Sequence, residues 1–316
     1  MDRSDFEAAH ELSRRIVDNV ETVIIGKRTV IEEALIAVIA GGHILLEDVP
    51  GVGKTLLAKS LARSFGSEFA RIQFTPDLMP SDVTGVSIYD QQSGSFRFRK
   101  GPVFANVVLA DEINRANPRT QSALLEAMEE RQVTVDGETC ALPEPFFVLA
   151  TQNPIEYEGV YALPEAQLDR FMLKLSIGYP SESEEKTVVL SQLRGHPIDR
   201  LEPVCASEDI LRLQTVVAAC HVDDAVYDYV LKIVSSTRRA EALQLGASPR
   251  GTLALVRGAQ ALAIIKGREF TTPDDVKQLA VSTLAHRMLL APQARLGDAD
   301  TAAIVNDILD DVAVPV

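Results

Sequence analysis

The sequence predicts an α/β domain built on a parallel sheet, followed by a small all-α domain. In the first half, short apolar runs alternate with helical patterns, and such runs are typical of parallel strands covered on both faces. Five runs have this character: residues 44–46, 69–74, 107–110, 146–150 and 171–177. Beyond residues 178–185, strand signals fade and helix starts accumulate. We therefore expect an α/β domain over 1–180, opening with an N-terminal helix, and a helical domain over 181–316.

Composition narrows the class of protein. The 316 residues suit about two domains. Lys and Arg total 31 and Asp and Glu total 45, a formal net charge of −14 that makes nucleic acid an unlikely partner. Charges throughout the first twenty residues argue against a secretory signal, and the longest apolar run, 34–40, is too short for a membrane span. Three scattered cysteines lack metal-ligand spacing. We expect a soluble cytoplasmic protein.

A phosphate-binding loop is predicted directly after the first strand. Gly51-Val-Gly53-Lys54-Thr55 stands between that strand and a helical pattern. Glycines let backbone N–H groups approach phosphates, and the helix N-terminus adds partial positive charge. Lys54 is expected to contact the β- and γ-phosphates of a nucleotide, and Thr55 to ligate Mg²⁺. Asp48 occupies the place of the first glycine in the usual eight-residue pattern.

Two hairpins are expected to interrupt the α/β alternation. In the second, residues 132–142, an Asp-Gly turn lies between alternating segments, a strong hairpin signal. In the first, residues 86–100, we expect apolar side chains on one face and arginines on the other. The apolar set is Val86, Ile88, Phe96 and Phe98, and the arginines are Arg97 and Arg99.

Two carboxylates follow the third strand. Asp111 and Glu112 come directly after a buried apolar run, which places them at the carboxyl edge of the sheet, where open α/β sheets bind ligands. Asp111 is expected to hold Mg²⁺, partly through water, and Glu112 to polarise an attacking water. A glutamate after the aspartate favours hydrolysis over transfer to an organic acceptor.

Three residues later in the chain are candidates for contact with a nucleotide, and each also has an ordinary structural explanation. Asn153 ends the fourth strand and is able to orient water or touch the γ-phosphate, or simply to form a turn before Pro154. Arg170 is a second candidate, and a surface ion pair would explain this arginine equally well. Arg250 lies in the first turn of a predicted helix, where a cation opposes the helix dipole, so a bound phosphate would explain it.

With these residues assembled, the chain resembles an AAA+ ATPase of the MoxR family. The resemblance runs from about Val20 to the C-terminus and is dense between Leu45 and Phe171. The matching segments are residues 45–55, 73–77 with 80–82, 101–104, 110–116, 124–130, 150–154 and 164–171. The family implies a five-stranded parallel core, a helical lid, and a ring, usually hexameric, with ATP and Mg²⁺ between subunits.

The resemblance also assigns roles. Asn153 matches sensor 1, Arg250 matches sensor 2 of the lid, and Arg170 matches the arginine finger that reaches a neighbour's γ-phosphate. The nucleotide-binding set becomes Pro50, Gly51, Val52, Gly53, Lys54, Thr55 and Leu56, with Ile25 and Gly26 on the adenine side. The hairpins match the helix-2 and pre-sensor-1 insertions. Family members remodel or mature protein clients, often with a separate von Willebrand factor A-domain protein.

Other functions stay open at this point. Related motors include a magnesium-chelatase subunit and, less favoured by the acidic charge, a DNA helicase or an enhancer-binding activator. A small-molecule kinase would act as a monomer and would need neither Glu112 nor Arg170 from a neighbour. A nucleotide-gated scaffold would share every motif, so turnover and partner data would be needed to separate it.

Overall fold

The computed structural model describes residues 1–316 except 92–93, 155–160, 194, 298 and 316. Its centre is a five-stranded parallel sheet in the order β2-β5-β8-β1-β9. The strands are β1 (Ile44–Glu47), β2 (Phe69–Gln73), β5 (Val107–Asp111), β8 (Phe147–Gln152) and β9 (Leu173–Leu175). All five predicted strands and the predicted fold class are therefore confirmed.

Alternate residues of the strands enter two apolar layers, as the two-residue period of a strand requires. Ile44 and Leu46 join the larger cluster with α1 (Arg3–Glu21), α2 (Arg28–Ile39) and α3 (Lys54–Ser64). Leu45 joins the other cluster with α4 (Pro80–Thr84) and α5 (Pro118–Glu130). Burial on both faces explains why these strands read as continuous apolar runs.

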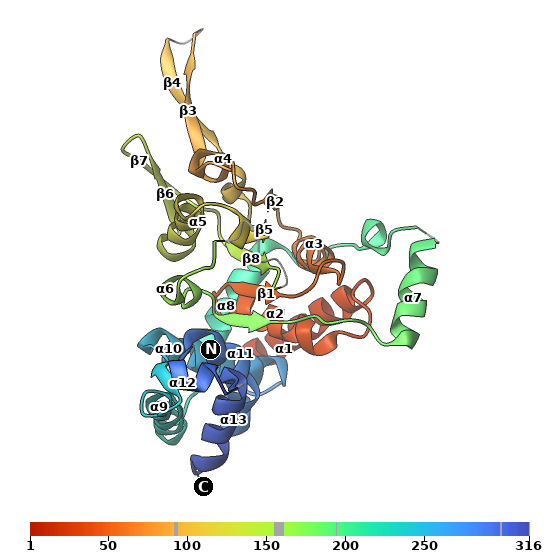
Figure 1. Cartoon of the computed structure of the whole chain (residues 1–316). Helices are drawn as coiled ribbons and strands as arrows, with labels where there is room; N and C mark the ends of the chain where they lie inside the picture. The colour runs from red at the N-terminus through yellow and green to blue at the C-terminus, as the bar shows by residue number, and fades with distance from the viewer. Residues whose placement is uncertain (92–93, 155–160, 194, 298, 316) are drawn as a thin grey trace.

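Both predicted hairpins are present and project from one side of the sheet (Figure 1). They are β3 (Gly85–Asp90) with β4 (Ser95–Lys100), and β6 (Gln132–Val135) with β7 (Glu138–Ala141). The predicted faces of the first hairpin are wrong. Val86 pairs with Arg99 and Ile88 with Arg97, and directly paired residues share a face. The register therefore mixes arginine with aliphatic side chains on one face and puts Phe96 and Phe98 on the other.

The later part of the chain is mainly helical. Its principal helices are α6 (Glu165–Leu168), α7 (Glu182–Leu193), α8 (Ser207–Ala219), α9 (Asp224–Thr237), α10 (Pro249–Ile265), α11 (Pro273–Leu284), α12 (Pro292–Arg295) and α13 (Thr301–Asp311). A short ribbon of β10 (Leu243–Leu245) and β11 (Leu289–Leu290) joins them. The larger apolar cluster continues from α1 and α2 into α10 and α11 without interruption.

Short 3₁₀ turns complete the chain at Pro102–Phe104, Ile113–Arg115, Pro197–Arg200 and Ala285–Arg287. The predicted boundary near residue 180 falls between β9 and α7 and stays a prediction. Within the described ranges, no helix is both long enough and apolar enough to cross a membrane.

Candidate nucleotide-binding site

The predicted phosphate loop lies between β1 and α3, at the carboxyl edge of the sheet. Gly51 and Gly53 have φ angles of +88° and +98°, which favour glycine, and a Cβ built on either would meet no atom within 4 Å. The loop thus borders open space at the N-terminus of α3, a suitable place for phosphate. Lys54 Nζ donates to the backbone oxygen of Asp48 at 2.7 Å.

The side chain of Asp48 fastens this loop to the chain after β9. It is 7% exposed, and its Oδ2 accepts the backbone N–H groups of Ile177 and Gly178 and the hydroxyl of Ser176. A glycine at position 48 would leave those donors unpaired. The departure from the usual loop pattern therefore has a structural reason that the sequence alone did not reveal.

Asp111 ends β5 and Glu112 follows it, so both lie at the same edge, as predicted. The Thr151 hydroxyl joins them: it donates to Asp111 Oδ1 at 2.7 Å and accepts the backbone N–H of Glu112 at 2.8 Å. Glu112 adopts a left-handed conformation, with φ of +57°. The hydroxyl of Thr55, in the first turn of α3, forms no hydrogen bond to another described residue. A hydroxyl and a carboxylate are ligands that Mg²⁺ prefers, so this donor set fits the metal.

Sequence reasoning missed two polar residues of β2. Arg71 Nη2 lies 2.6 Å from Asp111 Oδ2, and Gln73 Nε2 donates to Glu112 Oε2 at 2.7 Å. Arg71 therefore neutralises the carboxylate that is expected to hold Mg²⁺, and Gln73 holds the expected catalytic carboxylate. The sequence did hold a signal, because Arg71 and Gln73 are polar residues near the end of an otherwise apolar predicted strand. The carboxyl ends of parallel strands meet at one edge of a sheet, so residues there lie close to Asp111 when the two strands are neighbours.

Asn153 and the predicted adenine-side segment lie on either side of the loop. Asn153 is buried just after β8, the strand between β1 and β5. Gly26 has a φ of +73°, and a Cβ there would meet the carboxylate of Glu184 at the start of α7. Lys27 Nζ donates to the backbone oxygen of Tyr179 at 2.8 Å. The segment 177–184 thus connects the phosphate loop to Ile25 and Gly26.

The two candidate arginines lie together at the opposite edge of the sheet. Arg170 Nε is 2.8 Å from Glu129 Oε2, and Arg250 forms an ion pair with the other oxygen of the same carboxylate. Both arginines and Glu129 line a pocket that also includes His43, the residue before β1. We call Arg170, Arg250 and Glu129 the arginine cluster. Its place at the amino edge separates it from its own chain's phosphate loop by the length of β1.

Asp169 fixes the start of α10 beside this cluster. Its carboxylate accepts the Ser248 hydroxyl at 2.8 Å and Nε of the buried Arg287 at 2.9 Å. Arg287 also donates to the backbone oxygens of Phe171 and Met172. The helical part is thereby locked against the chain that enters β9, which holds Arg250 near Arg170.

Comparisons with known proteins match both the α/β part and the helical part of the chain. The model of the "ATPase family associated with various cellular activities (AAA)" matches residues 43–173, and that of the "AAA lid domain" matches 235–308. The crystal structure of a Cytophaga hutchinsonii protein, described as a candidate ATPase, superposes with a TM-score of 0.93 at 38% identity, covering 99% of this chain and 98% of the other.

Two curated relatives cover almost the whole chain. The "Uncharacterized protein YeaC" of Bacillus subtilis is 54% identical, over 98% of this chain and 97% of its own. The "Chaperone MoxR1" of Mycobacterium tuberculosis is 43% identical, over 97% of this chain and 83% of its own. With an AAA core, an AAA lid and a full-length relative of that name, the chain belongs to the MoxR family of AAA ATPases.

Proposed function

We propose that this protein is a Mg²⁺-dependent ATPase that works as a ring, usually hexameric in its family, with each nucleotide held between two subunits. One observation carries the proposal: the phosphate loop and the arginine cluster lie at opposite edges of one sheet. A subunit therefore offers one half of a nucleotide site on each side. Head-to-tail contacts of this kind close into rings when the rotation permits.

Each residue then has a defined task. Backbone groups of Pro50 to Leu56 and the Lys54 ammonium would hold the phosphates, with Ile25 and Gly26 beside the adenine. Thr55 and Asp111 would hold Mg²⁺, which when bound offsets negative charge on the phosphates. For Asp111 to do so, its ion pair with Arg71 must open.

Hydrolysis needs a polarised water and stabilisation of charge in the transition state. Glu112, held by Gln73 and Thr151, would polarise the water, and Asn153 would orient it. Arg170 and Arg250 of the neighbouring subunit would supply the cations. Because Arg250 lies beside Arg170, we propose that it performs the sensor-2 role on the nucleotide bound by the neighbouring subunit and not on the nucleotide bound by its own chain. Glu129 would neutralise both arginines until the phosphates compete for them.

The family relationship supports a chaperone role for this ATPase. The relative named "Chaperone MoxR1" matches over nearly the full length of this chain. We propose that ATP cycles remodel or mature a protein client in the cytoplasm, together with a separate von Willebrand factor A-domain protein. The two projecting hairpins, with Phe96 75% exposed at the tip of one, are suited to contact such partners.

A related motor is the main competing function. The chloroplast "Magnesium-chelatase subunit ChlI-1" of Arabidopsis thaliana is 26% identical over 64% of this chain. This identity is lower, and the match shorter, than for the relative named "Chaperone MoxR1", which favours the chaperone function.

The test measures ATP hydrolysis per subunit across a protein concentration series, with mass determined by light scattering on the same samples. We expect specific activity to rise together with a shift to rings. A monomer that hydrolyses ATP at full rate at every concentration would contradict the shared site and favour a kinase or a switch.

A further inference from the structure

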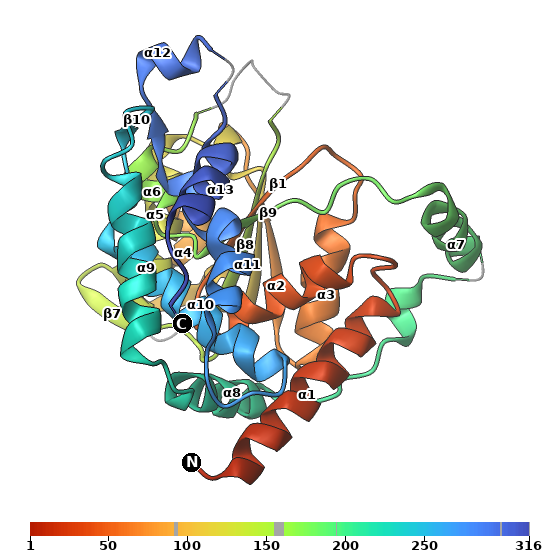
Figure 2. The same ribbon diagram turned by 90° about the horizontal axis from the view of Figure 1, so that it is seen from below.

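Helix α7 stands away from the rest of the protein (Figures 1 and 2). None of its twelve residues is buried. Val189, Leu190 and Leu193 are 52%, 47% and 79% exposed, and their spacing places them on one face. A helix of this length is marginal in water without tertiary packing. The exposed stripe therefore indicates a missing partner surface.

The segment that leads into α7 is nevertheless held beside the phosphate loop, and the first turn of α7 contacts Gly26. Asp48 accepts the N–H groups of Ile177 and Gly178, and Glu184 packs against Gly26. The helix thus projects from the carboxyl-edge side of the subunit, where the proposed nucleotide site opens toward a neighbour.

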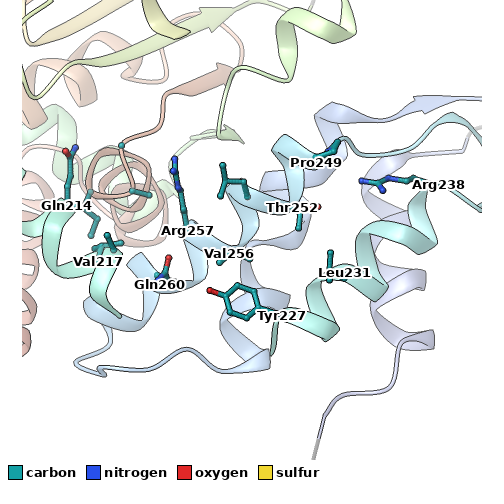
Figure 3. A pocket seen from close by; sticks show the side chains of 15 residues that line it. Gln214, Val217, Tyr227, Leu231, Arg238, Pro249, Thr252, Val256, Arg257 and Gln260 are labelled. Atoms are coloured by element: carbon teal, nitrogen blue, oxygen red, sulfur yellow. The ribbon is translucent and has the colours of Figure 1, made fainter. Parts of the chain in front are cut away.

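A complementary groove lies on the other side. It has a volume of about 740 Å³ and is formed by the end of α2 with α8, α9 and α10 (Figure 3). Tyr227, Leu231 and Leu253 line it and are 42%, 54% and 49% exposed. Arg238 and Arg257 also line it. An exposed apolar groove edged by cations suits an amphipathic helix that carries acidic residues.

The groove is continuous with the arginine cluster. The pocket around Arg170 and Arg250 shares Leu253 and Arg257 with the groove. An interface that brings Arg170 to a neighbour's phosphate loop would also bring the groove to the element that projects beside that loop, and that element is α7.

We propose that α7 of one subunit docks into the α8–α9–α10 groove of the next. The occupant is a second copy of this chain, and charge supports the pairing: Glu182 and Glu185 lie in the first turn of α7, whereas Arg238 and Arg257 line the groove. At 1.5 Å per residue, α7 is about 18 Å long. The contact is heterologous, so each subunit gives one helix and receives one. The inference rests on the ring proposed above.

The test uses two variants, each of which breaks one half of the contact. The double variant Leu190→Arg with Leu193→Arg places charge on the apolar face of α7 and leaves the groove unchanged. The variant Leu231→Arg places charge in the groove and leaves α7 unchanged. All three leucines are exposed, so the fold should tolerate the changes. Leu296→Arg, at a leucine that is 90% exposed and outside both surfaces, is the matched control. Mass is measured by light scattering with Mg²⁺ and ATPγS, and calorimetry checks that each variant still binds ATPγS.

We expect the wild type and the control to form rings and each interface variant alone to stay monomeric. A one-to-one mixture of the two variants should stop at dimers, because one intact helix meets one intact groove and the second contact is spoiled. Rings from either variant, or a mixture that stays monomeric, would overturn the docking while leaving the ring intact. A monomeric wild type would overturn the ring itself and the docking with it.

Discussion

Oδ2 of Asp48 lies 3.2 Å from the backbone nitrogen of Gly178. This hydrogen bond joins the phosphate loop to the segment that leads into α7, so the nucleotide site and the projecting helix share one support. The first glycine of the usual loop pattern has been exchanged for a carboxylate that makes this connection.

Asp48→Ala should lower the free energy of unfolding by about 1–3 kcal/mol, because it leaves buried N–H donors without an acceptor. Urea titration measures the change. Asp48→Asn keeps one acceptor oxygen and should lose less. Equal stability of Asp48→Ala and wild type would show that water replaces the carboxylate without cost.

Lys54→Ala should abolish nucleotide binding in calorimetry, because it removes the cation expected on the β- and γ-phosphates. Lys59→Ala, on the exposed side of the same helix, is the control and should bind normally. Unchanged affinity of Lys54→Ala would refute the assigned contact.

Glu112→Gln should keep ATP bound but lower kcat by a factor of about 10²–10⁴, the usual contribution of a general base. Calorimetry and phosphate release measure the two effects separately. Turnover at the wild-type rate would remove Glu112 from the mechanism.

Arg170→Ala and Arg250→Ala should each reduce turnover with little effect on ATP affinity; for Arg170 the reduction should be about 10³-fold or more. Mixing either variant with Lys54→Ala subunits should restore part of the activity, since the Lys54→Ala subunit brings intact arginines to a site that binds ATP. Restoration for Arg170 but not for Arg250 would place Arg250 on its own chain's nucleotide.

Arg71→Gln should lower the Mg²⁺ concentration needed for half-maximal hydrolysis, because the guanidinium competes with the metal for Asp111. Rates are measured against free Mg²⁺ at fixed ATP. An unchanged or higher requirement would mean that Arg71 does not oppose the metal.

Acid should destabilise the protein through two buried histidines. Burial and Arg131 lower the pKa of His43 to about 3, and burial and Arg287 hold the pKa of His286 well below its usual value. Below pH 6.5 the unfolded chain then binds more protons, so the stability present above that pH falls by up to about 1.4 kcal/mol per unit for each group. His43→Gln should show a shallower loss between pH 7 and 5 in urea titrations. An unchanged slope would contradict the assigned protonation.

Local chemistry explains what the sequence could predict. The phosphate loop needs adjacent residues of fixed type, and buried parallel strands need continuous apolar runs, so local patterns predicted residues 44–55 and Asp111. Contacts between residues far apart in the sequence could not be predicted in this way. The register of the first hairpin puts Val86 opposite Arg99, and the alternation within a single strand does not fix how two strands pair. The meeting of Arg250 with Glu129 depends on how the helical part packs, and no local pattern encodes that.

Helix α1 packs against both α3 and α10, and the apolar cluster around Ile16 runs unbroken into Leu255. A hinge between the two parts of a subunit would have to tear this cluster open. We therefore expect each subunit to move as one rigid body. The conformational change that accompanies an ATP cycle would then occur at the interfaces between neighbouring subunits.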